Sequence, residues 1–307
     1  MTRKFTYIVP IHNKEDILAN TLAGIAAGCS RDACIYTVLD GCTDGSEAIV
    51  DAFSRQSNLD VRKLFMPDVH MLLSVNAALR KVREGFTIVM QDDIVLQEPD
   101  LEKKVLDLYD RMGPRLGVVS FRLAANIRRA RLKTQIAHRQ IKPMIEECDY
   151  LQGPDDHQVC VPIGSYGHFY PRMVAINGPN CIPETVLRSV GLLDERLAPY
   201  GYDDPDYCIR TIQAGFQNGL YPVRYQSELS WGGTRRDPTF VKRTFQIHGR
   251  NRTYLWQKHG HFIRSLWHSD TIYRGIDPLA ALANTAGNDA HSRALSKDAV
   301  ACHTRQS

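Results

Sequence analysis

Residues 86–93 read Phe-Thr-Ile-Val-Met-Gln-Asp-Asp, an apolar run that ends in two adjacent carboxylates. A short run rich in β-branched and aromatic residues is typical of a buried strand. Asp92 and Asp93, at the exit of that strand, would repel each other unless a cation or hydrogen-bond donors met them. Mg²⁺ and Mn²⁺ prefer oxygen ligands and often take one or two carboxylates together with substrate phosphates. The pair therefore indicates either a metal–phosphate site or, more simply, a turn or helix cap where a strand ends.

Strand and helix patterns alternate on both sides of this run. We expect strands at residues 6–9, 34–39, 61–65, 86–90 and 116–121, and helices at 15–27, 47–54, 72–83 and 101–111. Strands separated by helices predict βαβ units on a parallel sheet, and hence the α/β class. Ligands of such sheets bind at the carboxyl ends of the strands. The turn from Pro10 to Asn13, Asp40 and the Asp92–Asp93 pair all follow such ends, so we expect them to converge on one crevice.

Composition limits the class of protein. The 307 residues are 43% hydrophobic and 23% charged, as in an ordinary globular protein of one large or two small domains. A net charge of +4 does not indicate nucleic-acid binding, and no apolar run is long enough to span a membrane. The N-terminus shows no signal peptide, and the eight cysteines form no CxxC pair. These features predict a cytoplasmic protein with reduced thiols and no nucleic-acid partner.

A second acidic cluster, Tyr-Asp-Asp-Pro-Asp, occupies residues 202–206. Pro205 suits the first position of a helix, which predicts Asp204 as the N-cap, and Asp206 can pair with Arg210 one turn later. A helix N-terminus also stabilises an ionised carboxylate, which would keep it available as a base. Capping and catalysis are both open for this cluster, and they are compatible. Helices are also predicted at 184–190, 205–214 and 241–258.

The segment from Arg122 to Lys142 carries seven Arg and Lys residues and no acid. The simpler interpretation is a solvated helix face. The alternative is a basic surface for an anionic acceptor, such as a lipid diphosphate, or for the headgroups of a membrane. Beyond about residue 276 the chain is rich in Ala, Asn, Ser and His, and we expect that tail to be disordered.

Five motifs, in order over about residues 5–260, resemble those of the inverting glycosyltransferase family 2, which has the GT-A nucleotide-sugar fold. They are Ile8-Val9-Pro10-Ile11-His12-Asn13, Leu39-Asp40-Gly41-Cys42-Thr43-Asp44, Asn76, the DxD-type Met90-Gln91-Asp92-Asp93, and Gly191-Leu192-Leu193-Asp194-Glu195 followed by Asp203-Asp204-Pro205-Asp206. The resemblance implies a mixed, mainly parallel sheet flanked by helices, with a helical C-terminal extension. It divides the chain into a nucleotide-sugar-binding half (1–121), an acceptor-binding half of the same domain (122–262) and an extension (263–307).

The resemblance also assigns roles. It implies that Asp93 holds Mn²⁺ or Mg²⁺ against the diphosphate of a nucleotide-sugar donor. Asp204 corresponds to the base that deprotonates the acceptor hydroxyl, with Asp203 as the reserve candidate. The donor-binding residues are expected to be Pro10, His12, Asn13, Asp40, Asn76, Gln91 and Asp92, and the acceptor-side residues Asp194, Glu195 and Trp231. Asp194 and Glu195 are expected to fix a loop.

The acceptor implied is a glycan or a lipid-linked sugar, with peripheral membrane contact through the basic segment. Trp231 stands where some members carry a metal-binding His, so it is expected to stack on a sugar ring, and His248 is the substitute metal ligand to consider. Two other classes stay open. A sugar-1-phosphate nucleotidyltransferase would normally show a Gly-rich basic loop after the first strand, and a binding module would keep the nucleotide pocket without turnover.

Overall fold

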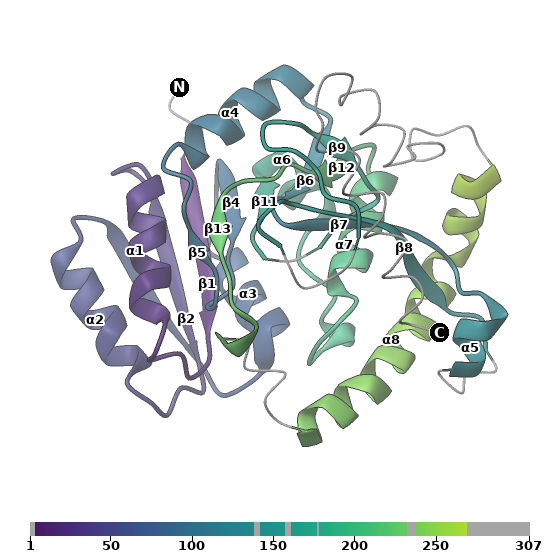
Figure 1. Ribbon diagram of the computed structural model, residues 1–307, viewed down its shortest axis with the longest axis horizontal. Coiled ribbons are helices and arrows are strands. Elements are labelled where there is room, and N and C mark those ends of the chain that lie inside the picture. Colours follow the sequence, from purple (N-terminus) through teal and green to yellow (C-terminus); the bar gives the residue numbers. More distant parts are fainter. Residues whose placement is uncertain (1–3, 138–141, 157–160, 177, 232–237, 269–307) are drawn as a thin grey trace, which may run out of the picture.

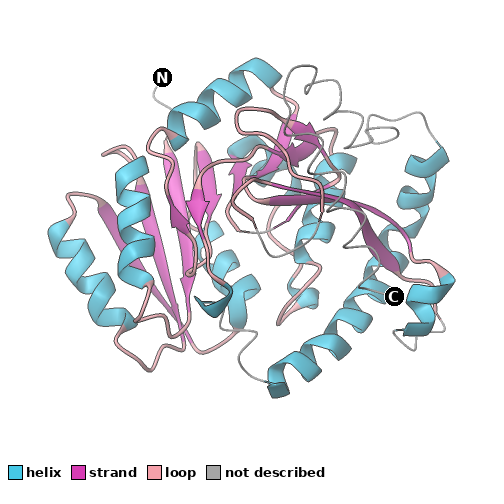
Figure 2. Cartoon of the chain, in the orientation of Figure 1, coloured by secondary structure: helices cyan, strands magenta, loops and turns pink. Residues whose placement is uncertain are grey.

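The computed structural model describes residues 4–137, 142–156, 161–176, 178–231 and 238–268. Its centre is an eight-stranded sheet in the order β3-β2-β1-β4-β11-β6-β12-β9. Helices lie on both sides of this sheet (Figures 1 and 2). The fold is α/β, as the alternating pattern predicts.

The N-terminal part of the sheet is parallel and built from consecutive βαβ units. Its strands are β1 (Phe5–Ile11), β2 (Cys34–Asp40), β3 (Asp60–Met66) and β4 (Phe86–Val89), joined by α1 (Leu18–Gly28), α2 (Ser46–Gln56) and α3 (His70–Leu79). β1 extends past Pro10, beyond the predicted end at Val9. The pairing of β1 with β4 ends at Ile8 and Val89. Pro10 lies beyond this point, so its lack of an N–H breaks no hydrogen bond of that pairing.

The remaining strands bring the second half of the chain into the same sheet. β11 (Asn180–Pro183) lies antiparallel between β4 and β6 (Leu116–Ser120). β12 (Gln217–Leu220) pairs parallel with β6, and β9 (Tyr170–Pro171) forms the edge. Strands from both predicted halves therefore share one sheet.

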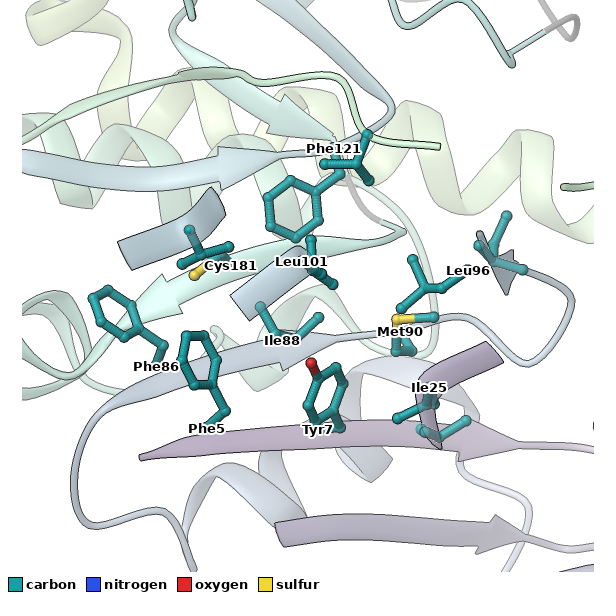
Figure 3. Close-up of a cluster of buried hydrophobic side chains, with 14 of the residues drawn as sticks. Phe5, Tyr7, Ile25, Phe86, Ile88, Met90, Leu96, Leu101, Phe121 and Cys181 are labelled. Atoms are coloured by element: carbon teal, nitrogen blue, oxygen red, sulfur yellow. The ribbon is translucent and has the colours of Figure 1, made fainter. Parts of the chain in front are cut away.

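The two faces of the sheet bury separate apolar clusters. One contains Phe5, Tyr7 and Ile88 with residues of α1, α2 and α4 (Leu101–Met112), and Figure 3 shows part of it. Phe5 and Phe86 stack there with ring centroids 5.4 Å apart. The other cluster packs α3, α6 (Glu184–Val190) and α7 (Asp203–Gln213) against the opposite face. This cover on both faces holds the strand ends in fixed register.

Smaller elements complete the fold. A three-stranded sheet contains β10 (Val174–Ile176), β7 (Leu123–Arg129) and β8 (Ile145–Gln152), and a ribbon pairs β5 (Val95–Leu96) with β13 (Tyr225–Gln226). The short helix α5 (Leu132–Ala137) follows β7, and α8 (Pro238–His268) packs on β7 and β8. Two 3₁₀ turns cover Glu195–Leu197 and Leu229–Trp231. In the described part of the chain, no helix is long and apolar enough to cross a membrane.

Most predicted elements of the first 121 residues are confirmed to within a few residues, but the basic segment is not a single helix face, because its described part begins with a strand and is helical only over residues 132–137. Residues 123–129 form the strand β7, in which Ala124, Ala125 and Ile127 are buried. The run Leu-Ala-Ala-Asn-Ile-Arg-Arg shows no helical period. β5 and the strands from β7 to β13 were not predicted. The tail expected to be disordered lies outside the described residues.

Candidate active site

The carboxyl ends of β1, β2 and β4 bring three predicted residues together. The main-chain N–H of His12 donates to Asp92 Oδ2 at 2.9 Å, and His12 Nδ1 lies 2.6 Å from the main-chain oxygen of Asp40. The imidazole of His12 is half exposed, with Asp68 Oδ1 at 3.8 Å from Nδ1. The strand order therefore places residues from three separate loops at one edge of the sheet, as expected of parallel strands.

Asp92 sits in a charged and largely buried environment. Burial raises the pKa of this carboxyl to about 7, the positive charge of Lys14 opposes that rise, and the charge of Asp93 adds to it. Lys14 Nζ lies 3.8 Å from Asp92 Oδ1, and its side chain is only 8% exposed. The same ammonium donates to the main-chain oxygen of Trp231. Sequence reasoning missed Lys14, although a cation directly after Asn13 in a strand-end turn was a usable signal.

Two loops at this edge are joined by what we call the loop latch, a set of hydrogen bonds between residues 13–15 and 43–46. Each bond runs from a main-chain N–H to a side-chain oxygen of the other loop. They are Thr43 N to Asn13 Oδ1 (2.8 Å), Gly45 N to Glu15 Oε2 (2.6 Å), Glu15 N to Asp44 Oδ2 (2.9 Å) and Lys14 N to Ser46 Oγ (2.9 Å). Asn13, a predicted donor contact, thus uses its amide oxygen in the latch. Its backbone has a positive φ of 49°.

Asp40 fixes the turn after β3. It is 3% exposed, and its Oδ1 accepts from the N–H of Val69 at 2.7 Å. Gly41 follows with φ +62°, and a Cβ there would lie 2.5 Å from the Cβ of Asp68, so the turn requires glycine. Pro10, which was also predicted to bind the donor, is buried within β1.

The carboxylate pair fits a cation whose remaining coordination positions are filled by substrate phosphates. Among the described residues, no three His, Cys, Asp or Glu side chains cluster closely enough to hold a metal ion by themselves. Mg²⁺ and Mn²⁺ commonly take one or two carboxylates and fill their remaining positions with water and phosphate oxygens. Asp92 is partly compensated by Lys14, whereas Asp93 is partly exposed at the strand end. The residues present therefore suit a shared cation, with Asp93 as its protein ligand.

A second group of acids lines a pocket of about 190 Å³. Gln91, the residue before the carboxylate pair, forms part of its wall, and its Oε1 accepts from Arg122 Nη1 at 3.1 Å. The other polar and aromatic lining residues include Glu147, Tyr200, Asp203, Asp204 and His248. This pocket is the place where the donor-side motif and the acceptor-side motif meet.

Burial shifts the pKa of two acids of the pocket in the same direction. Burial raises the pKa of Asp203 to about 6, although main-chain N–H groups oppose the rise. Burial also raises the pKa of Glu147, which accepts a hydrogen bond from Tyr150 at 2.7 Å. Asp204 is partly exposed in the first turn of α7. Glu147 comes from β8 in the smaller sheet, and nothing in its local sequence signals a place in this pocket.

Helix α7 begins two residues earlier than predicted. Its first residue is Asp203, preceded by Tyr202 in the left-handed conformation (φ 69°), so the expectation of an Asp204 N-cap and Pro205 at the first helical position is wrong. The left-handed Tyr202 turns the chain sharply and places both acids in the first helical turn. The helix N-terminus there favours an ionised carboxylate.

Asp206 has a structural role. Its predicted pairing with Arg210 is confirmed at 2.8 Å, and Lys258 (2.6 Å) and His259 (2.8 Å) of α8 also bind it. Burial alone would raise the pKa of this carboxyl, but the His259 hydrogen bond and the charges of Arg210 and Lys258 hold it below the ordinary value. This network fixes α7 against α8.

His248 closes one side of the pocket with two tyrosines. Its ring stacks on Tyr200 with centroids 5.6 Å apart and meets Tyr202 edge-on at 5.4 Å. Gly201 packs so tightly on this ring that a Cβ would lie 2.5 Å from it. The structure therefore places His248 in the acidic pocket as part of an aromatic wall.

Asn76 holds a loop. It is fully buried, its Oδ1 accepts from Leu193 N, and its Nδ2 donates to Leu193 O and Glu195 Oε1, all at 3.0 Å. Asp194 accepts from Tyr254 (2.7 Å) and Lys258 (2.8 Å). The geometry thus favours a positioning role for Asn76 over the expected donor contact, and it ties Asp194 and Glu195 into the same loop.

The backbone of Trp231 contacts Lys14, which follows the carboxyl end of β1. Its carbonyl accepts from Lys14, next to Asp92, while its N–H bonds to Glu228 O at 3.0 Å. The turn at Leu229–Trp231 therefore borders the strand ends of the N-terminal half. It was predicted as an acceptor-side residue only.

The sequence and the fold are similar to those of known proteins. The family model described as glycosyl transferase family 2 matches residues 6–162. No curated protein matches the sequence. The solved structure of GalNAc-T7 with UDP, GalNAc and Mn²⁺ is 12% identical, with a TM-score of 0.58 over 97% of this chain and 55% of that one. S. aureus TarS is 15% identical, with a TM-score of 0.51 over 74% of this chain and 37% of that one.

A shorter form of TarS, residues 1–349 in complex with UDP-GlcNAc, is 13% identical. Its TM-score is 0.51 over 92% of this chain and 80% of that one. At these identities the likeness concerns the fold, which is of the GT-A type. The chain spans little more than a third of TarS and just over half of GalNAc-T7.

Proposed function

The chain belongs to glycosyl transferase family 2, whose model matches half of its residues, and from this premise we propose that it is a nucleotide-sugar glycosyltransferase. It transfers a sugar from a nucleotide-diphospho-sugar to an acceptor hydroxyl, with inversion at the anomeric carbon and with a divalent cation. The acceptor is a glycan or a lipid-linked sugar, and the product belongs to cell-surface glycan assembly.

One observation carries the proposal. The pocket that contains Asp203 and Asp204 is also lined by Gln91, which directly precedes the Asp92–Asp93 pair. The residue next to the carboxylates suited to a diphosphate-bound cation thus lines the same cavity as a carboxylate suited to a hydroxyl proton. Direct transfer between two substrates requires this proximity, because the acceptor oxygen must reach the anomeric carbon of the bound donor.

On the donor side, we assign Asp92 and Asp93 different roles. Asp92 is held by the His12 N–H and faces Lys14, so it is oriented to bind the sugar part of the nucleotide. Asp93 holds Mn²⁺ or Mg²⁺, which when bound stabilises the negative charge of the departing diphosphate. The GalNAc-T7 structure contains UDP and Mn²⁺, which supports a donor and cation of this class here. Lys14 adds a fixed positive charge beside them.

On the acceptor side, Asp204 is the base. A hydroxyl is a poor nucleophile until a carboxylate accepts its proton, a contribution of roughly 10²- to 10⁴-fold in rate. Asp204 lies partly exposed at the N-terminus of α7, which favours its ionised form. The pKa of Asp203 is raised to about 6, so below that pH it is protonated and cannot accept the proton. A base facing the donor across one pocket permits in-line attack, and hence inversion.

Thermal denaturation against nucleotide sugars tests the proposal. UDP-, GDP- and dTDP-sugars are each added with and without Mn²⁺, because a ligand that binds the folded state raises Tm by mass action. We expect one nucleotide to raise Tm, and to do so more strongly with Mn²⁺. That nucleotide sugar is then tested for transfer to glycan acceptors. Stabilisation by none of the donors, with or without the cation, would contradict the proposal.

A further inference from the structure

The short helix α5 exposes two apolar side chains and buries a polar one. Leu132 and Ile136, one turn apart, are 71% and 66% exposed. Gln135 is buried and donates to Ala130 O at 3.3 Å, while Thr134 donates to Glu146 Oε2 at 2.5 Å. Helices on a protein surface normally bury their apolar residues and expose their polar ones. The anchoring of α5 through polar side chains leaves its apolar side chains outside.

Exposed cations surround these two side chains. Arg129, Arg131 and Lys133 are all exposed, and the stretch from Arg122 to Ile145 contains no acid. The nearest acid, Glu146, is 9% exposed as a side chain and is bound by Arg128 at 2.6 Å, with Arg131 at 3.8 Å. The buried acid therefore compensates Arg128 most directly. We call Arg129, Arg131, Leu132, Lys133 and Ile136 the α5 patch.

We propose that the α5 patch docks the protein on an anionic lipid membrane. Two apolar side chains on one helical turn suit shallow insertion at the boundary between headgroups and acyl chains, and flanking Arg and Lys side chains suit lipid phosphates. Membrane surfaces rich in anionic lipid attract such cations, and the apolar pair adds a contact that a soluble polyanion could not use. The proposal rests on the patch itself and stands independently of the proposed enzymatic activity.

The fold connects the patch to the acidic pocket through strand β8. Glu146 binds Arg128 and Thr134 beside α5, while the next residue, Glu147, lines the pocket. Consecutive residues of a strand point to opposite faces. Glu146, beside the patch, and Glu147, which lines the pocket, therefore lie on opposite faces of β8. The patch and the pocket are thus connected through two consecutive residues of one strand.

Vesicle co-sedimentation of the full chain tests the proposal. The probes are vesicles of phosphatidylcholine alone and of phosphatidylcholine mixed with phosphatidylglycerol. We expect binding to the anionic vesicles only, weakened by salt because exposed charges are screened. The double variants L132S/I136S and R131E/K133E should each reduce the partition coefficient by more than about tenfold. Their Tm should match that of the wild type, because all four side chains are exposed.

Two matched controls come from exposed residues elsewhere. Phe65 is 62% exposed on β3 at the sheet edge, and Lys103 is exposed on α4. F65S and K103E should bind anionic vesicles like the wild type. Equal binding by L132S/I136S and the wild type would overturn the proposal, since it would leave only non-specific charge attraction. So would failure of the wild type to bind, or a change of oligomeric state on L132S/I136S substitution without any lipid binding.

Discussion

The main-chain N–H of His12 and the carboxylate of Asp92 are joined by a hydrogen bond of 2.9 Å between residues 80 positions apart. The bond fixes one oxygen of Asp92 to the end of β1, and Lys14 faces the other oxygen at 3.8 Å. The orientation of the first carboxylate is thus set by the neighbouring strand. Asp93, the next residue, lies partly exposed where a cation and a diphosphate would be bound.

Asp93→Asn is expected to abolish the Mn²⁺ dependence of nucleotide-sugar binding. The amide keeps the size of the side chain but loses the charge that a hard divalent cation requires. Isothermal titration with the stabilising nucleotide sugar, with and without Mn²⁺, measures the effect. Asp100→Asn, at an exposed position before α4, is the control and should behave like the wild type. Unchanged Mn²⁺ dependence in the Asp93 variant would refute the metal assignment.

Asp204→Asn is expected to lower kcat by about 10²- to 10⁴-fold, because the variant cannot accept the acceptor proton. The dissociation constant of the nucleotide sugar should stay the same. Steady-state kinetics combined with donor titration separates the two effects. Asp203→Asn should lower kcat less, and the reverse order would make Asp203 the base. A wild-type protein that binds donors but transfers no sugar to any acceptor would favour the binding-module alternative.

Asp203 makes stability depend on pH. Its pKa is raised by burial from 3.8 to about 6, so the folded state binds its proton more tightly than the unfolded state. The contribution of Asp203 to the free energy of unfolding is therefore fully present below about pH 4 and is lost as the pH rises to about 6. The total loss is up to about 3 kcal/mol, and the contribution stays low at higher pH. Asp203→Asn should remove this decline. Denaturant unfolding of both proteins between pH 4 and 8 measures it, and parallel curves would contradict the assignment.

Asn76→Ala is expected to reduce the free energy of unfolding by about 2–3 kcal/mol, because it leaves the buried N–H and C=O of Leu193 without their partner. Donor affinity should change little. Urea denaturation gives the stability, and donor titration gives the affinity. Asn20→Ala, at an exposed position of α1, should be nearly neutral. A variant with normal stability and lost donor binding would restore the expected role of Asn76 as a nucleotide contact.

The N-terminal half was predictable because its signals are local. Buried runs such as 86–90 alternate with amphipathic helices, and parallel strands then put Asp40 and Asp92 at one edge. The acceptor half gave weaker signals. β7 contains Ala124, Asn126 and two arginines, so neither a helical nor a clear strand period marked it. Glu147 enters the pocket only through the pairing of β8 with β7, which is a tertiary effect.

The start of α7 shows the same limit on a smaller scale. Capping preferences pointed to Asp204, but Tyr202 takes the left-handed conformation and the helix begins at Asp203. Arg252 stacks on the ring of Tyr202 at 5.0 Å and donates to its hydroxyl. A contact with a helix 50 residues later in the chain thus accompanies a backbone conformation that local sequence would disfavour.

The loop latch has a consequence for changing donor preference by directed evolution. Every one of its bonds pairs a main-chain donor with a side-chain acceptor, so the two kinds of position tolerate replacement differently. Position 43 contributes mainly its N–H and can be randomised, with proline left out of the library. Asn13, Glu15, Asp44 and Ser46 supply the accepting oxygens and should be held constant, so that new nucleobase contacts are selected on loops that keep their shape.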